Sequence, residues 1–284
     1  MTTPQPKSDA QLITDAVGAH GVFFKNALRE LIERIPGTRV IGEEYPVLYL
    51  EGASLDLLVE FRVGGSALLL PIECKRALAT MKKWIFFKDK EQETKFLYSF
   101  DGTGLNVSKS SLIPITPDIC VEGLEIDSSK LRAGQKSPYN AASADRIWDS
   151  AFQVCKGGLG FLQNELKARE QQPPVGQDFS VFFVIVTTAP LQIAELPPGS
   201  VQLSSGEHSG ELQLRDVPWL ILHHPFTPSS ALGSTHLRVN PSGYTDPAFR
   251  GLNGKEGILV VNAQHVAALF ERLRALLTAL AIAH

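Results

Sequence analysis

The sequence lacks an apolar run of the 18 or so residues that a membrane-spanning helix needs. Its first residues, MTTPQPKSDAQ, contain no apolar signal core, so we expect no secretory signal. Only three cysteines occur (Cys74, Cys120 and Cys155), and no two form a CxxC pair, which argues against a disulfide scaffold or a zinc ribbon. An excess of one charge is also missing, because 27 basic residues against 30 acidic ones give a net charge of -3. These absences exclude a globally basic coat protein and predict a cytoplasmic protein outside the membrane.

Apolar residues make up 44% of the 284 residues, which is enough for a substantial core. The 23 glycines and 18 prolines cluster between apolar runs, a pattern typical of a mixed α/β domain with long loops. We predict one domain with three parts. These are a core over about 12–75 and 141–225, an insertion over about 76–140, and a C-terminal loop and helix over 226–284.

The first 75 residues are predicted to form a helix and three strands. Ser8 and Gln11 have the spacing of a capping box ahead of a helical pattern that ends before Pro36-Gly37. Glycines in its middle leave open one kinked helix or two short ones. Gly64-Gly65 predicts a tight hairpin turn between the second and third strands. The expected helix covers 12–35, and the expected strands cover 38–50, 55–63 and 67–75.

The rest of the chain is predicted to add two helices and two strands. The helix over 145–170 contains Gly157, Gly158 and Gly160, which indicate close backbone packing or a break. The run FSVFFVIVTT at 179–188 is typical of a buried strand. The remaining expected elements are a strand at 219–223, a long loop at 225–256 and a helix at 263–283.

The residues that indicate chemistry are Asp56, Glu73 and Lys75. Glu73 and Lys75 are two apart in a strand, so they project from the same face. Pairing the two strands around the glycine turn makes the numbers of facing residues sum to about 129, which places Asp56 opposite Glu73. Two carboxylates brought together repel each other unless a positive group lies between them. A divalent cation such as Mg²⁺, with Mn²⁺ able to substitute, is the natural group, because it prefers oxygen ligands.

This pattern supplies the parts for hydrolysing a phosphodiester bond. Asp56 and Glu73 would hold the metal, with the backbone carbonyl of Cys74 as a third ligand. Lys75 would orient or help to deprotonate a metal-bound water, or stabilise charge that develops on a phosphate. The competing interpretation for Glu73 and Lys75 is a surface ion pair, but the flanking LLLPI reads as buried, and buried charges are rarely left unpaired.

The segments SLDLLVEF and LLPIECKR, with Asp56 opening one strand and Glu73-x-Lys75 on the next, resemble the PD-(D/E)XK nuclease superfamily. The resemblance covers roughly residues 12–190. It implies a restriction-endonuclease-like α/β core, in the order helix, three strands, helix, strand, with a mixed central sheet flanked by helices. It also implies a Mg²⁺-dependent nuclease of DNA, less often of RNA. The chain departs from the pattern at Leu55, where proline is common, and at Pro71, which removes a ladder hydrogen bond from the third strand.

The resemblance also implies accessory residues near the metal. Some members add a carboxylate from the first helix or first strand, for which Glu44 is our preferred candidate. Some place a glutamine on the helix after the lysine strand, a role that Gln153 can fill with Lys156 nearby. For Gln153 and Lys156, the residues alone slightly favour the alternative of an exposed helix face. The other candidates for the extra carboxylate are Glu30, Glu33 and Glu43.

A basic stretch over 75–95 carries seven Lys or Arg residues and three Asp or Glu residues, interleaved with aromatic side chains. It fits a surface that contacts a phosphate backbone. The alternative is a solvated element whose aromatics pack on the core. The residues we predict to bind nucleic acid are Arg76, Lys82, Lys83, Lys88 and Lys156.

Our leading hypothesis is a metal-dependent nuclease acting on DNA, with restriction, repair and phage defence all open. The alternative is a catalytically inactive nucleic-acid-binding module on the same scaffold. A third hypothesis is an interaction protein in which arginines such as Arg62 or Arg76 pair with Asp56 and Glu73. A homodimer is compatible with double-strand cutting, which needs two sites. We expect the adjacent His223 and His224 to point to opposite faces of a strand, which disfavours a metal site there.

Overall fold

The protein is described here by a computed structural model. The described residues are 8–19, 21–47, 54–77, 82–88, 97–100, 107–110, 115–127, 146–171, 179–196, 199–202, 204–205, 208, 210–225 and 255–282. Most of the expected loop at 225–256 and much of the expected insertion at 76–140 lie outside these ranges.

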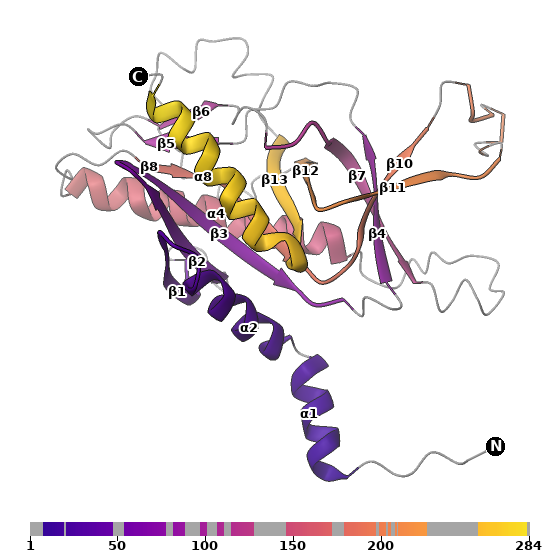
Figure 1. The fold of residues 1–284 in the computed structure, drawn as a ribbon, viewed down its shortest axis with the longest axis horizontal. Coiled ribbons are helices and arrows are strands. Elements are labelled where there is room, and N and C mark those ends of the chain that lie inside the picture. The colour runs from indigo at the N-terminus through magenta and orange to yellow at the C-terminus, as the bar shows by residue number, and fades with distance from the viewer. Residues whose placement is uncertain are drawn as a thin grey trace.

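The chain forms an α/β fold built on one large mixed sheet (Figure 1). From one edge, the main path of the sheet runs β1-β2-β3-β9-β13-β12-β7-β4-β10-β11, and a branch from β3 runs through β8 and β5 to β6. The strands are β1 (Thr38–Pro46), β2 (Ser54–Val63), β3 (Ser66–Lys75), β4 (Lys82–Lys88), β5 (Leu97–Phe100), β6 (Val107–Ser110), β7 (Ile119–Asp127), β8 (Phe179–Val181), β9 (Val184–Thr187), β10 (Leu191–Glu195), β11 (Gln213–Val217), β12 (Trp219–Pro225) and β13 (Lys255–Asn262).

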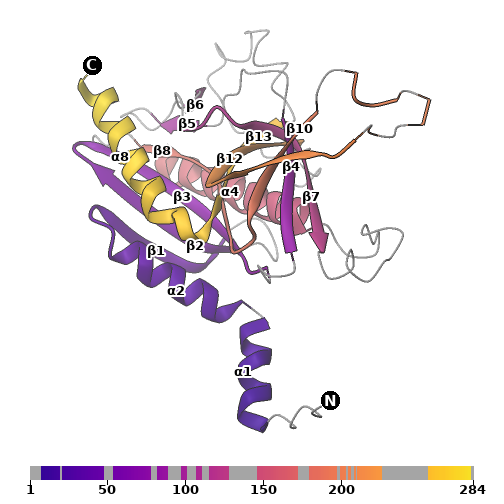
Figure 2. The same ribbon diagram turned by 45° about the vertical axis from the view of Figure 1, so that its right-hand side comes forward.

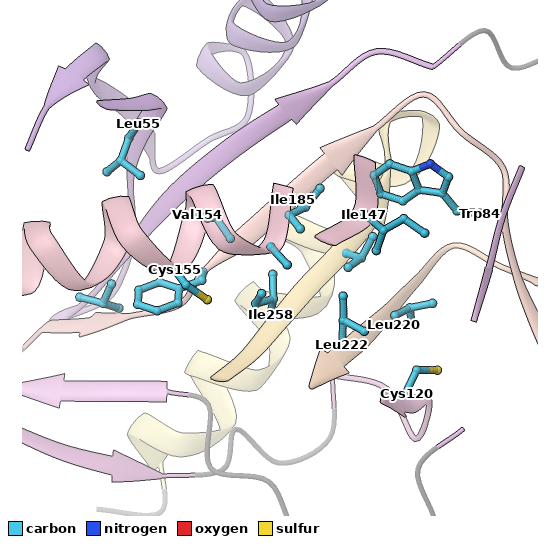
Figure 3. Packing of buried hydrophobic residues seen from close by; sticks show 14 of the residues in the cluster. Leu55, Trp84, Cys120, Ile147, Val154, Cys155, Ile185, Leu220, Leu222 and Ile258 are labelled. Carbon is cyan, nitrogen blue, oxygen red and sulfur yellow. The ribbon is translucent and has the colours of Figure 1, made fainter. Parts of the chain in front are cut away.

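Helices cover both faces of the sheet and make three layers (Figures 1 and 2). Alternating side chains of β2, β3 and β9 supply two cores, one packed under α2 and α8 and the other under α4. In Figure 3, Ile147, Val154 and Cys155 of α4 lie over Ile185 and Ile258 of the sheet. The helical elements are α1 (Asp9–Ala19), α2 (Val22–Glu33), α4 (Arg146–Gln171), the 3₁₀ turn η1 (Ala263–His265) and α8 (Val266–Ile282).

The N-terminal helical region is two helices, and α1 projects away from the sheet in both ribbon views (Figures 1 and 2). The break falls at Gly21, whose φ of 82° is left-handed. The capping box is confirmed, because the Ser8 N–H donates to Gln11 Oε1 and the Gln11 N–H donates to Ser8 Oγ, both at 3.3 Å. Among the helices in the described ranges, none has the length and apolar character needed to cross a membrane.

The β2–β3 hairpin sets the geometry of the candidate site. Val63 pairs with Ser66 across the two-residue turn, and the ladder continues without a shift to Leu57 opposite Ile72. Every pair sums to 129, so the predicted register is confirmed. Asp56 and Glu73 are the next residues along the two strands.

Pro71 fits the sheet because it lies at an interruption between two neighbouring strands. On the edge of β3 away from β2, the parallel ladder to β8 ends at Leu69 and the ladder to β9 begins at Ile72. Pro71 therefore needs no ladder partner on that edge, and the hairpin register passes through it unchanged. The single strand expected at 179–188 is divided into β8 and β9 at the same interruption.

Two described strands of the expected insertion, β4 and β7, belong to the central sheet. They pair with each other in antiparallel fashion, while β4 also pairs with β10 and β7 with β12. Trp84 and Phe86 of β4 are fully buried in the core under α4. Trp84 and Phe86, two aromatic residues of the basic stretch, are therefore core residues.

The glycines of α4 allow the helix to approach the sheet closely. A Cβ on Gly158 would lie 2.3 Å from the ring of Phe183, and a Cβ on Gly157 would lie 2.5 Å from Cδ2 of Leu55. Close packing, rather than a break, is thus the structural reason for the glycines at 157 and 158, since α4 is continuous from Arg146 to Gln171.

We expect Gly158→Ala to lower the free energy of unfolding by about 1 to 3 kcal/mol, because overpacking against the buried Phe183 outweighs the better helix propensity of alanine. Urea denaturation measures the change. Gly65→Ala is the matched control, because its Cβ would meet nothing within 4 Å. Equal stability of the two variants would contradict this packing role.

Candidate active site

Asp56, Glu73 and Lys75 lie together at the ends of β2 and β3. The Cys74 N–H donates to Asp56 Oδ2 at 2.7 Å, so the aspartate bridges from β2 to the backbone of β3. Lys75 Nζ lies 2.8 Å from Glu73 Oε1, as expected for residues two apart on one face. Glu73 is only 5% exposed. The structure therefore brings the three predicted residues into one cluster.

Gln153 of α4 joins this cluster. Lys75 Nζ donates to Gln153 Oε1 at 3.1 Å, so the lysine is held between β3 and the helix above it. Lys156 is half-buried three residues further along α4. Cys74 points to the other side, where it packs against the core under α2 and α8, and burial raises the pKa of its thiol well above its usual range. A protonated thiol of this kind is a poor nucleophile.

The two central carboxyl groups are held in their protonated form more strongly than ordinary carboxyl groups. Burial, followed by the charge of Asp56, raises the pKa of Glu73 to about 7, although Lys75 opposes this rise. Burial also raises the pKa of Asp56, while the hydrogen bond from Cys74 opposes the rise and the charge of Glu44 adds to it. Desolvation and like charge together make this cluster favourable for an added positive ion.

Among the four candidates for an extra carboxylate, Glu44 is the one whose charge acts on Asp56 and Glu73. Its backbone has a φ of 43°, the one positive value among the described residues other than glycine. Such strain concentrates at functional sites. Its charge raises the pKa of both Asp56 and Glu73. The other three candidates for the extra carboxylate have different partners, because Glu30 pairs with Arg34, and Arg29 pairs with both Glu33 and Glu43.

Lys25 of α2 is a member of the site that the sequence did not indicate. It forms an ion pair with Glu44, and its side chain is only 16% exposed. Burial lowers its pKa, but the hydrogen bond and charge of Glu44 outweigh this effect, so that the pKa of Lys25 is raised. Asp56 also contributes to that rise. The only signal in the sequence is that Lys25 and Arg29 lie one helical turn apart, matching the adjacent Glu43 and Glu44.

The basic residues predicted to bind nucleic acid are partly neutralised. Lys82 pairs with Glu125 at 2.5 Å, and Lys88 pairs with Asp118 at 3.1 Å. Arg76, which follows Lys75 directly, and Lys83 on β4 are exposed. The stretch is therefore less positive in the fold than its own composition suggests.

The cluster offers few but suitable ligands for a divalent cation. Asp56 and Glu73 provide two carboxylates, and Mg²⁺ is commonly held by one or two carboxylates together with waters and substrate phosphates. The raised pKa of Glu73 is the observation that favours a cation there. Within the described ranges, no group of three or more His, Cys, Asp or Glu side chains is arranged to hold a metal. The residues thus fit an open site completed by other oxygens, not a closed structural site.

The two adjacent histidines of β12 lie in the sheet as buried residues. Burial lowers the pKa of His224 to about 4, and its ring lies 5.3 Å from that of Trp148 on α4. A neutral imidazole packed on an indole is a core arrangement.

Comparison with known proteins gives no further guide to the site: no family model, no curated protein and no solved structure matches the chain.

We expect Glu73→Gln to stabilise the metal-free protein more at high pH than at low pH. The usual pKa of 4.5 is raised to about 7 in the fold, so raising the pH between these values destabilises the native protein, which must ionise a buried group. Glutamine cannot ionise. In urea denaturation with a chelator, the advantage of the variant should grow by about 3 kcal/mol between about pH 5 and about pH 8. A constant difference would contradict the raised pKa.

We expect Glu44→Gly to be more stable than Glu44→Ala by about 1 kcal/mol, because both variants lose the carboxylate but only glycine accepts the left-handed backbone without strain. Thermal and urea denaturation measure the difference. If alanine is tolerated as well as glycine, the backbone at residue 44 carries no strain.

Proposed function

We propose that the protein is a metal-dependent nuclease that hydrolyses phosphodiester bonds, with DNA as the expected substrate. The observation that carries this proposal is the meeting of Asp56 from β2 with Glu73 and Lys75 from β3 on one buried face. The raised pKa of Glu73 adds to it. Restriction, repair and phage defence remain open as roles.

The arrangement of elements supports the same proposal. The described chain contains α2, then the β1–β2–β3 meander, then α4, then β9 beside and parallel to β3. This is the order helix, three strands, helix, strand that the resemblance implies. We propose that these elements form a restriction-endonuclease-like core, to which the remaining strands and α8 are added.

Each residue of the cluster has a role in the proposed reaction. Asp56, Glu73 and the carbonyl of Cys74 would hold Mg²⁺, or Mn²⁺ in its place, and the bound ion would supply an activated water and stabilise charge on the phosphate. Lys75 would orient that water or donate to a phosphate oxygen. Gln153 holds the Lys75 ammonium at 3.1 Å and so limits where it can point. Glu44 supplies further negative charge.

Contact with the nucleic-acid backbone is assigned to basic residues near the cluster, of which Arg76 and Lys83 are exposed and Lys156 is half-buried. Arg76 continues directly from Lys75, and Lys156 lies one turn beyond Gln153 on α4. Lys83 offers a third positive charge, while the ion pairs of Lys82 and Lys88 reduce their part. A second copy of the chain would be needed for cutting both strands at once, so a homodimer belongs to the proposal.

Two observations favour the nuclease over the other hypotheses. The aromatics Trp84 and Phe86 are buried in the core, which weakens the case for a binding module based on the 75–95 stretch. Arg62 pairs with Glu60 at 2.7 Å, and Glu73 pairs with Lys75. The carboxylate that Arg62 pairs with is therefore not one of the two, Asp56 and Glu73, that the interaction-protein hypothesis assigned to it.

The direct test is cleavage of single-stranded and double-stranded DNA and RNA in Mg²⁺ or Mn²⁺. We expect Asp56→Asn and Lys75→Ala each to lower cleavage by about 100-fold or more, because each removes charge that acts on the transition state. Glu43→Gln is the matched control, since Glu43 adjoins Glu44 in sequence but pairs with Arg29 on α2. Unchanged cleavage in either site variant sinks the mechanism. Salt-sensitive binding without any cutting supports the inactive binding module instead.

A further inference from the structure

A cavity of about 230 Å³ opens on the face of the sheet that α4 covers, away from the candidate active site. Leu58 of β2 and Leu69 of β3 belong to its buried apolar lining. Leu69 lies four residues from Glu73, which is about 13 Å along the strand at about 3.3 Å per residue. The cavity is therefore separate from the cluster formed by Asp56, Glu73 and Lys75.

Three aromatic rings from three different elements line this cavity. Phe161 of α4 and Phe179 of β8 are buried, and Tyr45 of β1 packs edge-on against Phe161 with 6.0 Å between the ring centroids. A Cβ on Gly42 would lie 2.4 Å from Cδ2 of Tyr45, so the glycine makes room for the ring. The β1–β2 register shifts at Ile41, and this extra residue also lines the cavity. The fold thus shapes a small recess with aromatic walls.

The polar part of the lining includes a buried carboxylate that two arginines hold. Glu60 of β2 is only 8% exposed. Arg62 Nη2 lies 2.7 Å from Glu60 Oε1, and Arg39 Nη2 lies 3.0 Å from Glu60 Oε2. The hydrogen bond from Arg62 lowers the pKa of Glu60, although burial opposes this effect. Because an ionised carboxylate has about four acceptor sites, Glu60 can accept further hydrogen bonds besides these two.

The polar groups at the cavity are of both kinds and nearly balance in charge. Glu60 and Glu165 supply acceptor oxygens to the lining, and Arg62 supplies N–H donors. Together with Arg39, which pairs with Glu60, two guanidinium groups match the two carboxylates. This balance suits an uncharged molecule that carries both donors and acceptors. At about 230 Å³ the cavity is smaller than the roughly 300 Å³ of the smallest drug-sized pockets, so it suits one small ring system.

We propose that this cavity binds a single nucleobase. Aromatic and apolar side chains would contact the faces of the base, and the carboxylates with Arg62 would bind its edge, which is how enzymes hold a base outside a duplex. The amino groups of adenine, cytosine and guanine can donate to a carboxylate, whereas thymine has no such group. The inference goes beyond the proposed function, because binding a base needs neither a metal ion nor cleavage. A free nucleoside and a nucleic-acid strand present the same base chemistry.

Calorimetry with the four deoxynucleosides, on the full chain in the presence of a chelator, tests the inference. We expect Ala67→Leu to weaken binding by about 10-fold or more, because Ala67 lines the small cavity and the larger side chain would fill part of it. Glu60→Gln should weaken the binding of deoxyadenosine more than that of thymidine, since it removes a charged acceptor for the amino group.

Ser66→Leu is the matched control. It introduces the same side chain at the preceding residue of β3, where alternation directs the side chain to the other face of the sheet. Nucleoside affinity should stay within about twofold of the wild type, as is usual for substitutions away from a site. Thermal denaturation checks that each variant is folded.

A parallel titration with single-stranded oligonucleotides distinguishes the two sources of the base. Weaker oligonucleotide binding by Ala67→Leu identifies a base within a strand, and weaker nucleoside binding alone identifies a free nucleoside. Both outcomes support the inference. Absence of binding by every probe, or binding that Ala67→Leu leaves unchanged, overturns it. Metal-dependent cleavage by the wild type tests the proposed function separately, because its result does not alter these affinities.

Discussion

The candidate site depends on the register of the β2–β3 hairpin. A turn of only two residues, Gly64 and Gly65, fixes which residues face each other, and the ladder then runs unshifted from the turn to Leu57 opposite Ile72. A slip of one residue would send Glu73 and Lys75 to the opposite face, under α2 and α8. Buried apolar residues on both faces of β3 prevent that slip, because each face must meet its own core. The geometry of the cluster is therefore set by packing and by a turn that lies away from Asp56, Glu73 and Lys75.

The same burial that holds the register also creates the electrostatic problem of the site. A carboxylate that is 5% exposed is expensive to ionise, and a second carboxylate beside it increases the cost. The fold offsets that cost with two partners. The backbone N–H of Cys74 donates to Asp56, and the ammonium group of Lys75 pairs with Glu73. These partners reduce the cost without removing it, since the pKa values of both carboxyl groups stay raised. The site thus retains an unsatisfied preference for positive charge.

Local patterns were sufficient to predict the features of the fold that lie close together in the sequence. The capping box at Ser8, the glycine turn and the register that places Asp56 beside Glu73 each involve residues that are near in sequence or related by one hairpin. Features that depend on distant segments were not predictable in this way. The partners of Lys82 and Lys88 come from residues 125 and 118, and the break between β8 and β9 reflects a change of neighbouring strands. Lys25 was missed for the same reason, because its role depends on where α2 meets β1.

Charge balance in the cluster has a consequence for the order of binding. Glu44, Asp56 and Glu73 carry three formal negative charges when ionised, and Lys25 and Lys75 carry two positive ones, so the metal-free cluster has an excess of negative charge. A polyanionic backbone is repelled by such a cluster and attracted to one that holds a divalent cation, which reverses the sign of the excess. Cation and nucleic acid should therefore each strengthen the binding of the other, since coupling between two sites is reciprocal. Under the proposed function, the exposed Arg76 and the half-buried Lys156 would then guide the strand toward a site that attracts it only when the cation is bound.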